Sequence, residues 1–335
     1  MRPFFPRWHD PRVWLFAVIP EVIWLFAVVA YTTFPPWLAG FTVHPLWFGG
    51  AATAIWVVAG YLLFDVRSGL ALVPIWLLTV LMLEDRGVVR WQGSTSPPGP
   101  RELLLVSANL EGYSFLTDPP VFSPGGAVPD IYLLQEERWM KDLVAASKAG
   151  GGKGTTDEYF IFAGRYTAIV VQGIIEERRQ LRHARSIMVK AKLKKGLTVF
   201  LLNIHIQPAE TDIRLWSPGT HRSHHYHVLS RNAELAMTLA EFESFRDEFG
   251  KGDEPVLIGG DFNIPAHDPA FSLFSPRYQD CFLKAGRGGG NTFPAVIPVY
   301  RLDRLFCNDL LDPVSVRVQK QEKSDHRALI ARFRY

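Results

Sequence analysis

The second half of the sequence carries five short polar groups in a fixed order, each beside an apolar run. They are Ser107-Ala108-Asn109-Leu110, Leu134-Gln135-Glu136, Asn203-Ile204-His205, Gly260-Asp261-Phe262-Asn263, and Asp303 with Ser324-Asp325-His326. Carboxylates hold hard cations, imidazoles handle protons or phosphate oxygens, and side-chain amides orient water or substrate. Placed at strand ends, these residue types are the ones that metal-dependent hydrolysis of a phosphate ester requires.

Each group taken alone has an ordinary structural explanation. A glutamate at a strand end, such as Glu136, is usually a solvated surface residue, and Asn109 alone reads as a turn former. Asp261 and Asn263 are two residues apart, so an extended backbone would point both side chains to one face. The alternative for this segment is a simple turn between a strand and a loop. The ordered set, and no single member, therefore indicates chemistry.

The set resembles the endonuclease/exonuclease/phosphatase superfamily over roughly residues 103–335. Residues 301–306 (Arg-Leu-Asp-Arg-Leu-Phe) stand where that superfamily has a characteristic strand. The resemblance implies an α/β fold, a four-layer sandwich of two packed mixed sheets flanked by helices. It also implies hydrolysis of a phosphodiester, phosphomonoester or pyrophosphate with Mg²⁺, or Mn²⁺ in its place. It leaves the substrate open, because specificity lies in the loops.

The resemblance also assigns roles to individual residues. The residues that it places at the metal are Asn109, Glu136 and Asp325. The residues that it places in catalysis are His205, Asp261, Asn263, Asp303 and His326. Asp303 would orient the imidazole of His326 and favour its charged form. Whether His326 takes the proton of water or stabilises the transition state stays open, as does the choice between one metal and two.

The N-terminal part has the composition of a membrane anchor. Residues 13–33 contain one charged residue, Glu21, and residues 46–64 contain none, so both runs are long enough to cross a bilayer. Residues 69–83 form a third, shorter apolar run that Pro74 interrupts, for which a buried or interfacial helix is the alternative. The first run is too long for a cleaved signal peptide. The sequence thus predicts two or three transmembrane helices.

The distribution of basic residues predicts an orientation. Arg2, Arg7 and Arg12 precede the first run, whereas residues 34–45 contain no Lys or Arg. By the positive-inside rule, the N-terminus is cytoplasmic and the first loop lies outside. Three spans would place the following domain outside the cytoplasm, and two would leave it inside. The expected localisation is the membrane, with the domain extracytoplasmic.

The expected domains are an anchor at 1–86, a linker at 87–101 and a globular domain at 102–335. Short apolar runs in the domain predict strands buried on both faces. These runs are residues 103–106, 131–134, 168–171, 186–191, 198–202, 256–258, 301–306 and 328–333. Apolar residues at helical spacing predict a covering helix from Ser230, as N-cap, to residue 249.

Charge gives no strong signal for nucleic acid. Residues 101–335 contain 30 basic and 28 acidic residues, without the basic excess that DNA-binding surfaces show. An endonuclease or exonuclease is therefore the first alternative, and a non-catalytic membrane receptor on the same fold is the second. Because an anchor would keep the site near the bilayer, we expect the bilayer and a phosphorylated lipid, or another phosphoester, as partners. The oligomeric state stays open.

Three segments are not explained by the resemblance. His221, His224, His225 and His227 are expected in a structural or solvated loop, with a phosphate clamp and a transition-metal site as alternatives. Residues 286–291 are glycine-rich and predict a mobile hairpin tip. Residues 176–182 carry mixed charge and predict a solvated loop. Cys281 and Cys307 do not decide the redox compartment.

Overall fold

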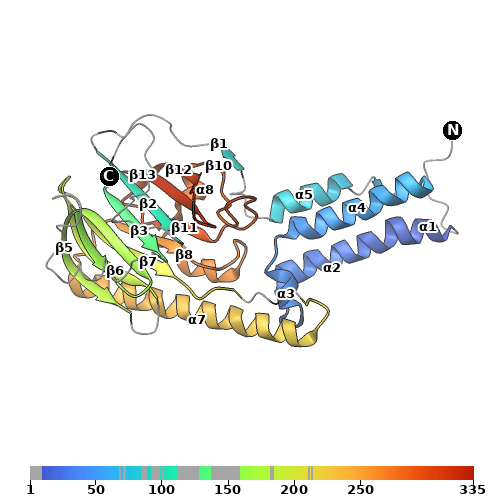
Figure 1. Cartoon of the computed structure of the whole chain (residues 1–335), viewed down its shortest axis with the longest axis horizontal. Coiled ribbons are helices and arrows are strands. Elements are labelled where there is room, and N and C mark those ends of the chain that lie inside the picture. Colours follow the sequence, from blue (N-terminus) through green and yellow to red (C-terminus); the bar gives the residue numbers. More distant parts are fainter. Residues whose placement is uncertain are drawn as a thin grey trace. The chain divides into compact units, whose positions relative to one another are not determined.

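The computed structural model describes residues 10–335 except 68, 71–72, 84–88, 92–98, 100, 112–127, 137–158, 182–184, 210–211 and 213. The chain divides into two compact units, whose elements are labelled in Figure 1. We call Met1–Arg86 together with Glu210–His227 the N-terminal unit. Gly87–Ala209 together with Val228–Tyr335 form the sheet unit.

Two helices of the N-terminal unit are long and apolar enough to cross a membrane. The first, Pro11–Thr33, comprises α1 (Pro11–Val13), a π-helical turn (Trp14–Val18) and α2 (Ile19–Thr33), and the second is α4 (Leu46–Phe64). The π-helical turn lies directly before Pro20, whose missing N–H interrupts ordinary helical hydrogen bonding. Only 28% and 22% of their most apolar windows are buried, so most of this surface is not used in a core. This exposure fits an anchor and remains weak evidence by itself.

The third apolar run forms the helix α5 (Val73–Leu83), which packs against α4 and reaches α2 through Trp76. The ring of Trp76 lies 6.1 Å from that of Trp24, and its indole nitrogen donates a hydrogen bond of 2.7 Å to Glu21 Oε2. The carboxylate in the middle of the first helix therefore has a partner. With 11 residues, α5 extends about 16 Å, against a hydrocarbon core of about 30 Å.

The sheet unit is built on one large curled sheet of 13 strands. The strands are β1 (Val89–Trp91), β2 (Glu102–Asn109), β3 (Ile131–Gln135), β4 (Tyr159–Ala163), β5 (Thr167–Gln180), β6 (Ile187–Leu193), β7 (Thr198–His205), β8 (Val256–Asp261), β9 (Gln279–Asp280), β10 (Gly286–Gly289), β11 (Asp303–Cys307), β12 (Asp312–Lys320) and β13 (Arg327–Arg334). Their order is β1-β10-β12-β13-β2-β3-β5-β6-β7-β8-β11-β9, with β4 beside β5. The mixed α/β fold is the one predicted.

Strand β5 connects the two halves of this sheet. Its first part pairs with β3 and β4, and its second part, from Gly173, pairs with β6. Gly173 has a φ of 155°, and a Cβ there would lie 2.2 Å from the carbonyl oxygen of Lys192. Only glycine therefore allows the strand to change partners at this close approach.

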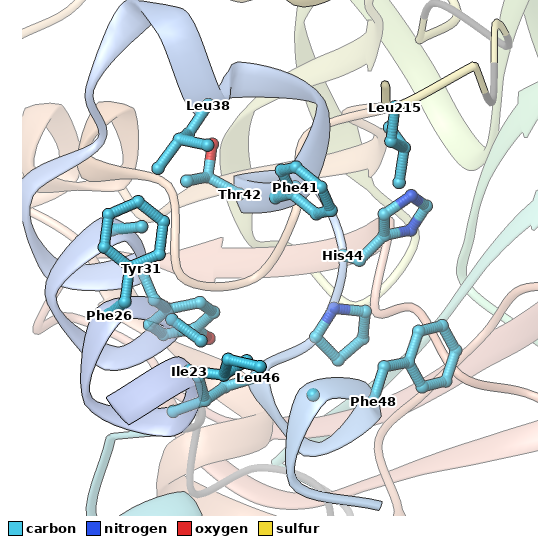
Figure 2. A pocket seen from close by; sticks show the side chains of 14 residues that line it. Ile23, Phe26, Tyr31, Leu38, Phe41, Thr42, His44, Leu46, Phe48 and Leu215 are labelled. Carbon is cyan, nitrogen blue, oxygen red and sulfur yellow. The ribbon is translucent and has the colours of Figure 1, made fainter. Parts of the chain in front are cut away.

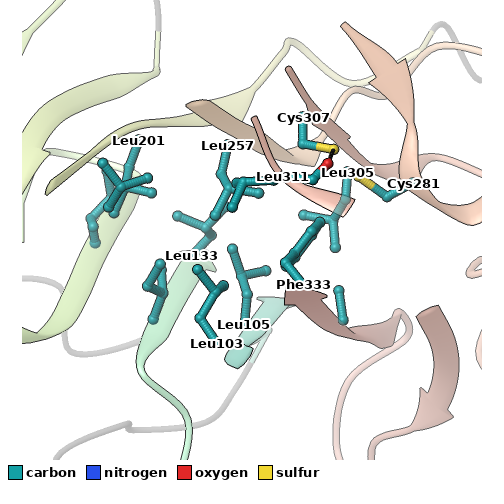
Figure 3. Close-up of a cluster of buried hydrophobic side chains, with 14 of the residues drawn as sticks. Leu103, Leu105, Leu133, Leu201, Leu257, Cys281, Leu305, Cys307, Leu311 and Phe333 are labelled. Atoms are coloured by element: carbon teal, nitrogen blue, oxygen red, sulfur yellow. Dashed lines mark hydrogen bonds between the residues drawn. The ribbon is translucent and has the colours of Figure 1, made fainter. Parts of the chain in front are cut away.

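The two halves bury one hydrophobic cluster between them, which Figure 3 shows in part. Strands β2, β3 and β13 contribute Leu103, Leu105, Leu133 and Phe333 from one half. The other half contributes Leu201, Leu257 and Leu305 from β7, β8 and β11. Both cysteines are free and buried in this cluster, Cys281 from α8 (Cys281–Ala285) and Cys307 from β11.

The helix α7 (Pro218–Phe249) covers the outer face of β6, β7 and β8. Its residues Leu235, Phe242 and Phe245 are fully buried there, as the helical spacing predicted. The predicted N-cap at Ser230 is wrong, because Ser230 lies inside the helix and the helix begins at Pro218, a residue suited to a first turn. The histidine segment is consequently helical and not a loop.

Two further local predictions are wrong. Residues 176–180 belong to β5, where exposed and half-buried residues alternate, so their mixed charge reflects a strand with one wet face. Residues 286–289 form β10 between β1 and β12, and are not a hairpin tip. A Cβ on Gly286 would lie 2.4 Å from the carbonyl oxygen of Phe282, so glycine serves close packing there. Strand β1 falls within the segment expected as a linker.

The carboxyl ends of four strands meet at one edge of the sheet unit. Strands β2 and β3 run parallel, as do β7 and β8, and Asp303 at the start of β11 pairs with Asp261. Gly260 brings β8 close to β7, since it has a φ of 134° and a Cβ there would lie 2.0 Å from the carbonyl oxygen of Ile204. Gly260 is thus a strand residue, not a turn residue, and its smallness places Asp261 beside His205.

Candidate active site

The centre of the site is the buried carboxylate of Asp261 at the end of β8. It accepts hydrogen bonds from the backbone nitrogen of Asn263 at 2.9 Å and from its side-chain amide at 3.2 Å. The amide of Asn109, at the end of β2, donates a third bond of 3.2 Å. Asn263 has a φ of 51°, which turns its side chain back toward Asp261. Both halves of the sheet therefore hold this carboxylate.

Glu136 and His205 form the second part of the site. Glu136 follows β3 in a left-handed conformation (φ 51°), and its Oε1 lies 2.9 Å from Nε2 of His205, which is buried at the end of β7. The hydrogen bond from His205 lowers the pKa of Glu136, although burial opposes the shift. Glu136 is only half-buried, so its carboxylate is negative and accessible at the edge.

His326 and Asp303 form the third part. Nδ1 of His326 lies 2.9 Å from Oδ2 of Asp303, and Nε2 lies 3.8 Å from Oδ2 of Asp261. The ring of Phe293 packs against the imidazole at 4.9 Å. Since Asp303 accepts at Nδ1, the proton on Nε2 points toward Asp261 and the open side of the site.

The electrostatics of this group assign different charge states to its members. Burial, followed by the nearby charge of Asp303, raises the pKa of Asp261 to about 6. Burial would lower the pKa of His326, but the charge and hydrogen bond of Asp303 outweigh it and raise this pKa to about 10. At neutral pH the site therefore holds an imidazolium beside a carboxylate that is ready to take up a proton.

An acidic residue that the sequence reasoning missed completes the edge. A hydrogen bond and the charge of Asp325 raise the pKa of Glu111, and the charge of Glu136 adds to the shift. Glu111 stands two residues after Asn109 in a turn that follows β2, where its backbone nitrogen donates to Oδ1 of Asn109 at 3.3 Å. Glu111, Glu136 and Asp325 thus concentrate negative charge at one place.

These residues fit a divalent cation of the hard type. The donors are oxygens, from the carboxylates of Glu111, Glu136 and Asp325 and the amide of Asn109, as Mg²⁺ and Mn²⁺ prefer. The raised pKa of Glu111 comes from its hydrogen bond with Asp325 and from the nearby charges of Asp325 and Glu136, and a cation would offset these charges. Ligand atoms of Glu136, His205 and Asp261 also lie within 4.8 Å of one another.

Buried amides fix the strand ends that carry the site. Asn203 donates two hydrogen bonds of 2.9 Å, to the carbonyls of Leu134 and Ala168, and accepts one of 2.7 Å from Gln135. These bonds tie β7 to β3 and β5, on the opposite half of the sheet. Gln321 and Ser324 both donate to the carbonyl oxygen of Asn109. These side chains are buried, and they hold the strand ends that carry the site residues.

A basic rim beside His205 was also missed. The carbonyl oxygen of Tyr166 accepts from the backbone nitrogen of Glu136 at 3.0 Å, and its ring lies 6.3 Å from that of His205. The guanidinium groups of Arg165 and Arg185 lie 5.1 and 4.5 Å from the Tyr166 ring. In sequence the two arginines are 20 positions apart, so no local pattern joins them.

The structure brings all eight predicted site residues to this edge. Seven of them interact directly as described, and Asp325 joins through Glu111. The histidines of residues 221–227 belong to the N-terminal unit instead. His221 accepts from Gly40 N at Nδ1 (3.1 Å) and donates to the Leu215 carbonyl at Nε2 (2.8 Å), while Nε2 of His224 donates to the Asp212 carbonyl (2.8 Å). Both nitrogens of His221 are engaged, which favours a structural role over metal binding.

Comparison with known proteins gives a family and a fold. The family model described as "Endonuclease/Exonuclease/phosphatase family" matches residues 89–326. The mannosyl-6-phosphatase Bt3783 of Bacteroides thetaiotaomicron is 14% identical, with 70% of this chain and 100% of that chain covered and a TM-score of 0.50. Truncated TDP2 of Caenorhabditis elegans is 22% identical, with 70% and 98% covered and a TM-score of 0.49. Comparison with curated proteins finds no match.

Proposed function

This chain belongs to the endonuclease/exonuclease/phosphatase family, whose members hydrolyse phosphate esters, and from that premise we propose a membrane-anchored, metal-dependent phosphoesterase. One observation carries the proposal. A single edge of the sheet joins Asp261, His326 and Glu136, which come from three separate strand ends. Such an edge can hold water, phosphate and a cation together.

Asp261 is proposed to orient and deprotonate the attacking water. Its pKa of about 6 leaves it ionised at neutral pH yet basic enough to receive a proton. Asn263 and Asn109 hold its carboxylate in place. The amide of Asn263 donates to Asp261 and to the carbonyl oxygen of Ile206 at 3.0 Å, so its two hydrogens are engaged and Asn263 is proposed to position Asp261.

His326 is proposed to stabilise the developing charge on phosphorus, not to act as the base. An imidazolium with a pKa of about 10 has no lone pair for a proton at neutral pH, and its Nε2–H points into the site. Asp303 keeps it charged. His205, on the side of Glu136, is proposed to assist the leaving group, with the Arg165–Arg185 rim beside it.

Glu136, Glu111, Asn109 and Asp325 are proposed to hold Mg²⁺ or Mn²⁺. When bound, the cation supplies neutralisation of charge on the phosphate oxygens. The concentration of carboxylates at an accessible edge supports this assignment. Without a counter-charge, the same carboxylates would repel an anionic substrate.

A lipid-linked phosphate is the proposed substrate. Residues 293–300 connect Phe293, which packs on His326, to an apolar tip where Val296 and Ile297 are 75% and 72% exposed. The same loop is fixed at Ala295, whose nitrogen donates to the Asp325 carbonyl. Exposed apolar residues this close to a polar site favour a lipid surface over nucleic acid.

An extracytoplasmic site is supported by the N-terminal unit. The hydrogen bond from Gly40 to His221 joins the first loop to a segment that follows β7 in the chain, so both lie on one side of the bilayer. The absence of Lys and Arg from residues 34–45 supports an outer location for that side. For the chain to return there after α4, the stretch of residues 65–86 that contains α5 has to complete a third crossing, because α5 alone is too short to span the bilayer.

The test is turnover by the full-length protein in detergent. We expect Mg²⁺-dependent hydrolysis that EDTA abolishes, with lipid phosphates preferred over plasmid DNA and water-soluble phosphates. Glu136→Gln should raise the Mg²⁺ concentration needed for half-maximal rate by about tenfold or more, as loss of one charged ligand predicts. Glu176→Gln, on an exposed part of β5, is the matched control.

Activity that survives EDTA, or equal metal requirements in both variants, would contradict the metal site. Preferential cleavage of DNA would contradict the lipid-linked substrate while leaving the phosphoesterase in place. Exposure of the sheet unit to protease added to intact cells measures the orientation, and a protected unit would reverse it.

A further inference from the structure

The N-terminal unit contains an apolar cavity of about 510 Å³. Figure 2 shows it lined by α2, by the short helices between α2 and α4 (a 3-10 turn at Pro36–Leu38 and α3 at Ala39–Thr42), by the start of α4, and by Leu215. Its lining residues include Phe26, Tyr31, Phe41 and Leu46. Pockets that bind small molecules typically measure roughly 300–1,000 Å³. The cavity is therefore large enough for a ligand and not a packing defect.

The lining offers hydrocarbon and no fixed charge. The hydroxyl of Thr42 is engaged within the protein, since it donates to the carbonyl of Ala39 at 3.1 Å. Burial, followed by the charge of His224, lowers the pKa of His44, so this imidazole is neutral at neutral pH. Apolar cavities of this kind take up apolar molecules in preference to water.

The position of the cavity along the two long helices indicates how deep in the bilayer it lies. Ala30 and Tyr31 lie near the end of α2, and Pro45 and Leu46 at the beginning of α4. Because residues 34–45 connect these two ends, they lie at the same face of the bilayer. A hydrocarbon chain enters the bilayer from its head group at this level.

One wall comes from the segment that follows the site strand in sequence. Leu215 stands ten residues after His205, and His221 holds it by donating to its carbonyl while accepting from Gly40. Gly40 lies close to this wall, since a Cβ there would be 2.9 Å from Cδ2 of Leu215 and 3.0 Å from Nδ1 of His221. Trp216 follows Leu215 in the sequence and is 82% exposed. Tryptophan is enriched at membrane–water interfaces, which fits this position.

We propose that this cavity binds one hydrocarbon chain of the phosphorylated lipid that the enzyme hydrolyses. The inference rests on the proposed function and adds a site for the apolar part of the substrate. The cavity recognises the hydrocarbon chain, and Leu215 in its wall follows His205 by ten residues in the sequence. Selectivity for long-chain over short-chain phosphates follows from it.

The experiment fills the cavity in full-length protein in phosphatidylcholine nanodiscs. Ala30→Trp places a large side chain in the cavity, and Val29→Trp places it on the neighbouring, 56% exposed position. Palmitic acid with a diazirine near its methyl end is the probe, and cross-linked residues are mapped by mass spectrometry. Leu215→Ala removes part of the cavity wall. It is the second variant, to be used if Ala30→Trp does not fold.

We expect wild type and Val29→Trp to cross-link at cavity residues, and Ala30→Trp to lose at least four-fifths of that signal. Ala30→Trp and Leu215→Ala should also raise KM for the lipid phosphate about tenfold. This is the loss of affinity expected when about two methylene groups of the lipid are no longer buried. The kcat for a water-soluble phosphate should not change in either variant.

Equal cross-linking in all variants would mean bulk lipid only and would overturn the site. Lost cross-linking with an unchanged KM would mean a structural lipid and would overturn its link to substrate. If wild type hydrolyses no phosphate ester, the proposed function fails, and so does the assignment of the bound hydrocarbon chain to a substrate. The cross-linking result still decides whether the cavity binds hydrocarbon.

Discussion

The two units of this chain distribute polar and apolar residues in opposite ways. In the sheet unit, Asp261, Asp303 and Asn203 are buried and held by named partners, while the surface is mixed in charge. In the N-terminal unit, side chains such as Ile55 and Leu62 are more than two-thirds exposed, and small residues and tryptophans fill the interior. One unit places charged groups against each other in its interior, and the other exposes apolar side chains on its helices.

The contrast predicts that histidines in the two units differ in importance for catalysis. His326→Ala removes the imidazolium beside Asp261 and should lower kcat by about 10²–10⁴-fold. His225→Ala, in the N-terminal unit, should have little effect. Steady-state rates of the full-length variants measure both. Similar losses in both variants would show that the histidines act through folding and not through chemistry.

A second prediction concerns the pH dependence of the site. Asp261 acts when ionised, so the rate should fall as pH drops through about 6, and His326 acts when protonated, so it should fall as pH rises through about 10. Asp303 raises both pKa values. Asp303→Asn should therefore move both limbs of the pH–rate profile to lower pH, and lower the maximal rate by roughly tenfold or more.

Movement of the limbs in opposite directions would contradict the shared role of Asp303. A replacement that merely loosens the fold would lower the rate at every pH without moving either limb, and this separates the two explanations. Asp312→Asn, on an exposed strand position, is the matched control and should leave the profile unchanged.

Much of the sheet unit could be predicted because its residues are constrained locally. A strand whose end carries a site residue leaves an apolar run beside a polar residue, and this residue follows the run in β3, β7 and β8 and precedes it in β13. Gly286 and Glu176 misled the prediction, because composition alone does not distinguish a glycine that packs closely, or a strand with one wet face, from a loop.

The remaining features depend on contacts between distant parts of the chain. Arg165 and Arg185 meet over Tyr166, and Glu111 meets Asp325, only after the strands have paired. Leu215 joins the N-terminal unit although it lies between β7 and α7 in sequence. No periodicity or spacing within a segment records such meetings, so the cavity could not be predicted.

A third prediction tests whether the N-terminal unit is packed by small residues. A Cβ on Gly60 would lie 2.4 Å from Cβ of Phe16, so Gly60→Leu should push α4 from the first helix and destabilise the unit by about 1–3 kcal/mol. Ala52→Leu, at an exposed position on α4, is the control. Thermal unfolding in nanodiscs measures the difference, and turnover of a water-soluble phosphate should be retained. Equal stability of both variants would mean that the helices do not touch at Gly60.

The smallest expected effect concerns the one carboxylate in the middle of the first helix. Trp76→Phe removes the hydrogen bond from α5 to Glu21 but keeps an aromatic ring in the cluster with Trp24. Hydrogen bonds between membrane helices average about 0.6 kcal/mol, so the cost should be of this order. In a double-mutant cycle with Glu21→Gln, the two changes should be less than additive by a similar amount, whereas exposed Trp37→Phe should show no coupling to Glu21. Additive effects of Trp76→Phe and Glu21→Gln would mean that α5 does not reach the middle of the first helix, and the third crossing that the extracytoplasmic site requires would lose its support.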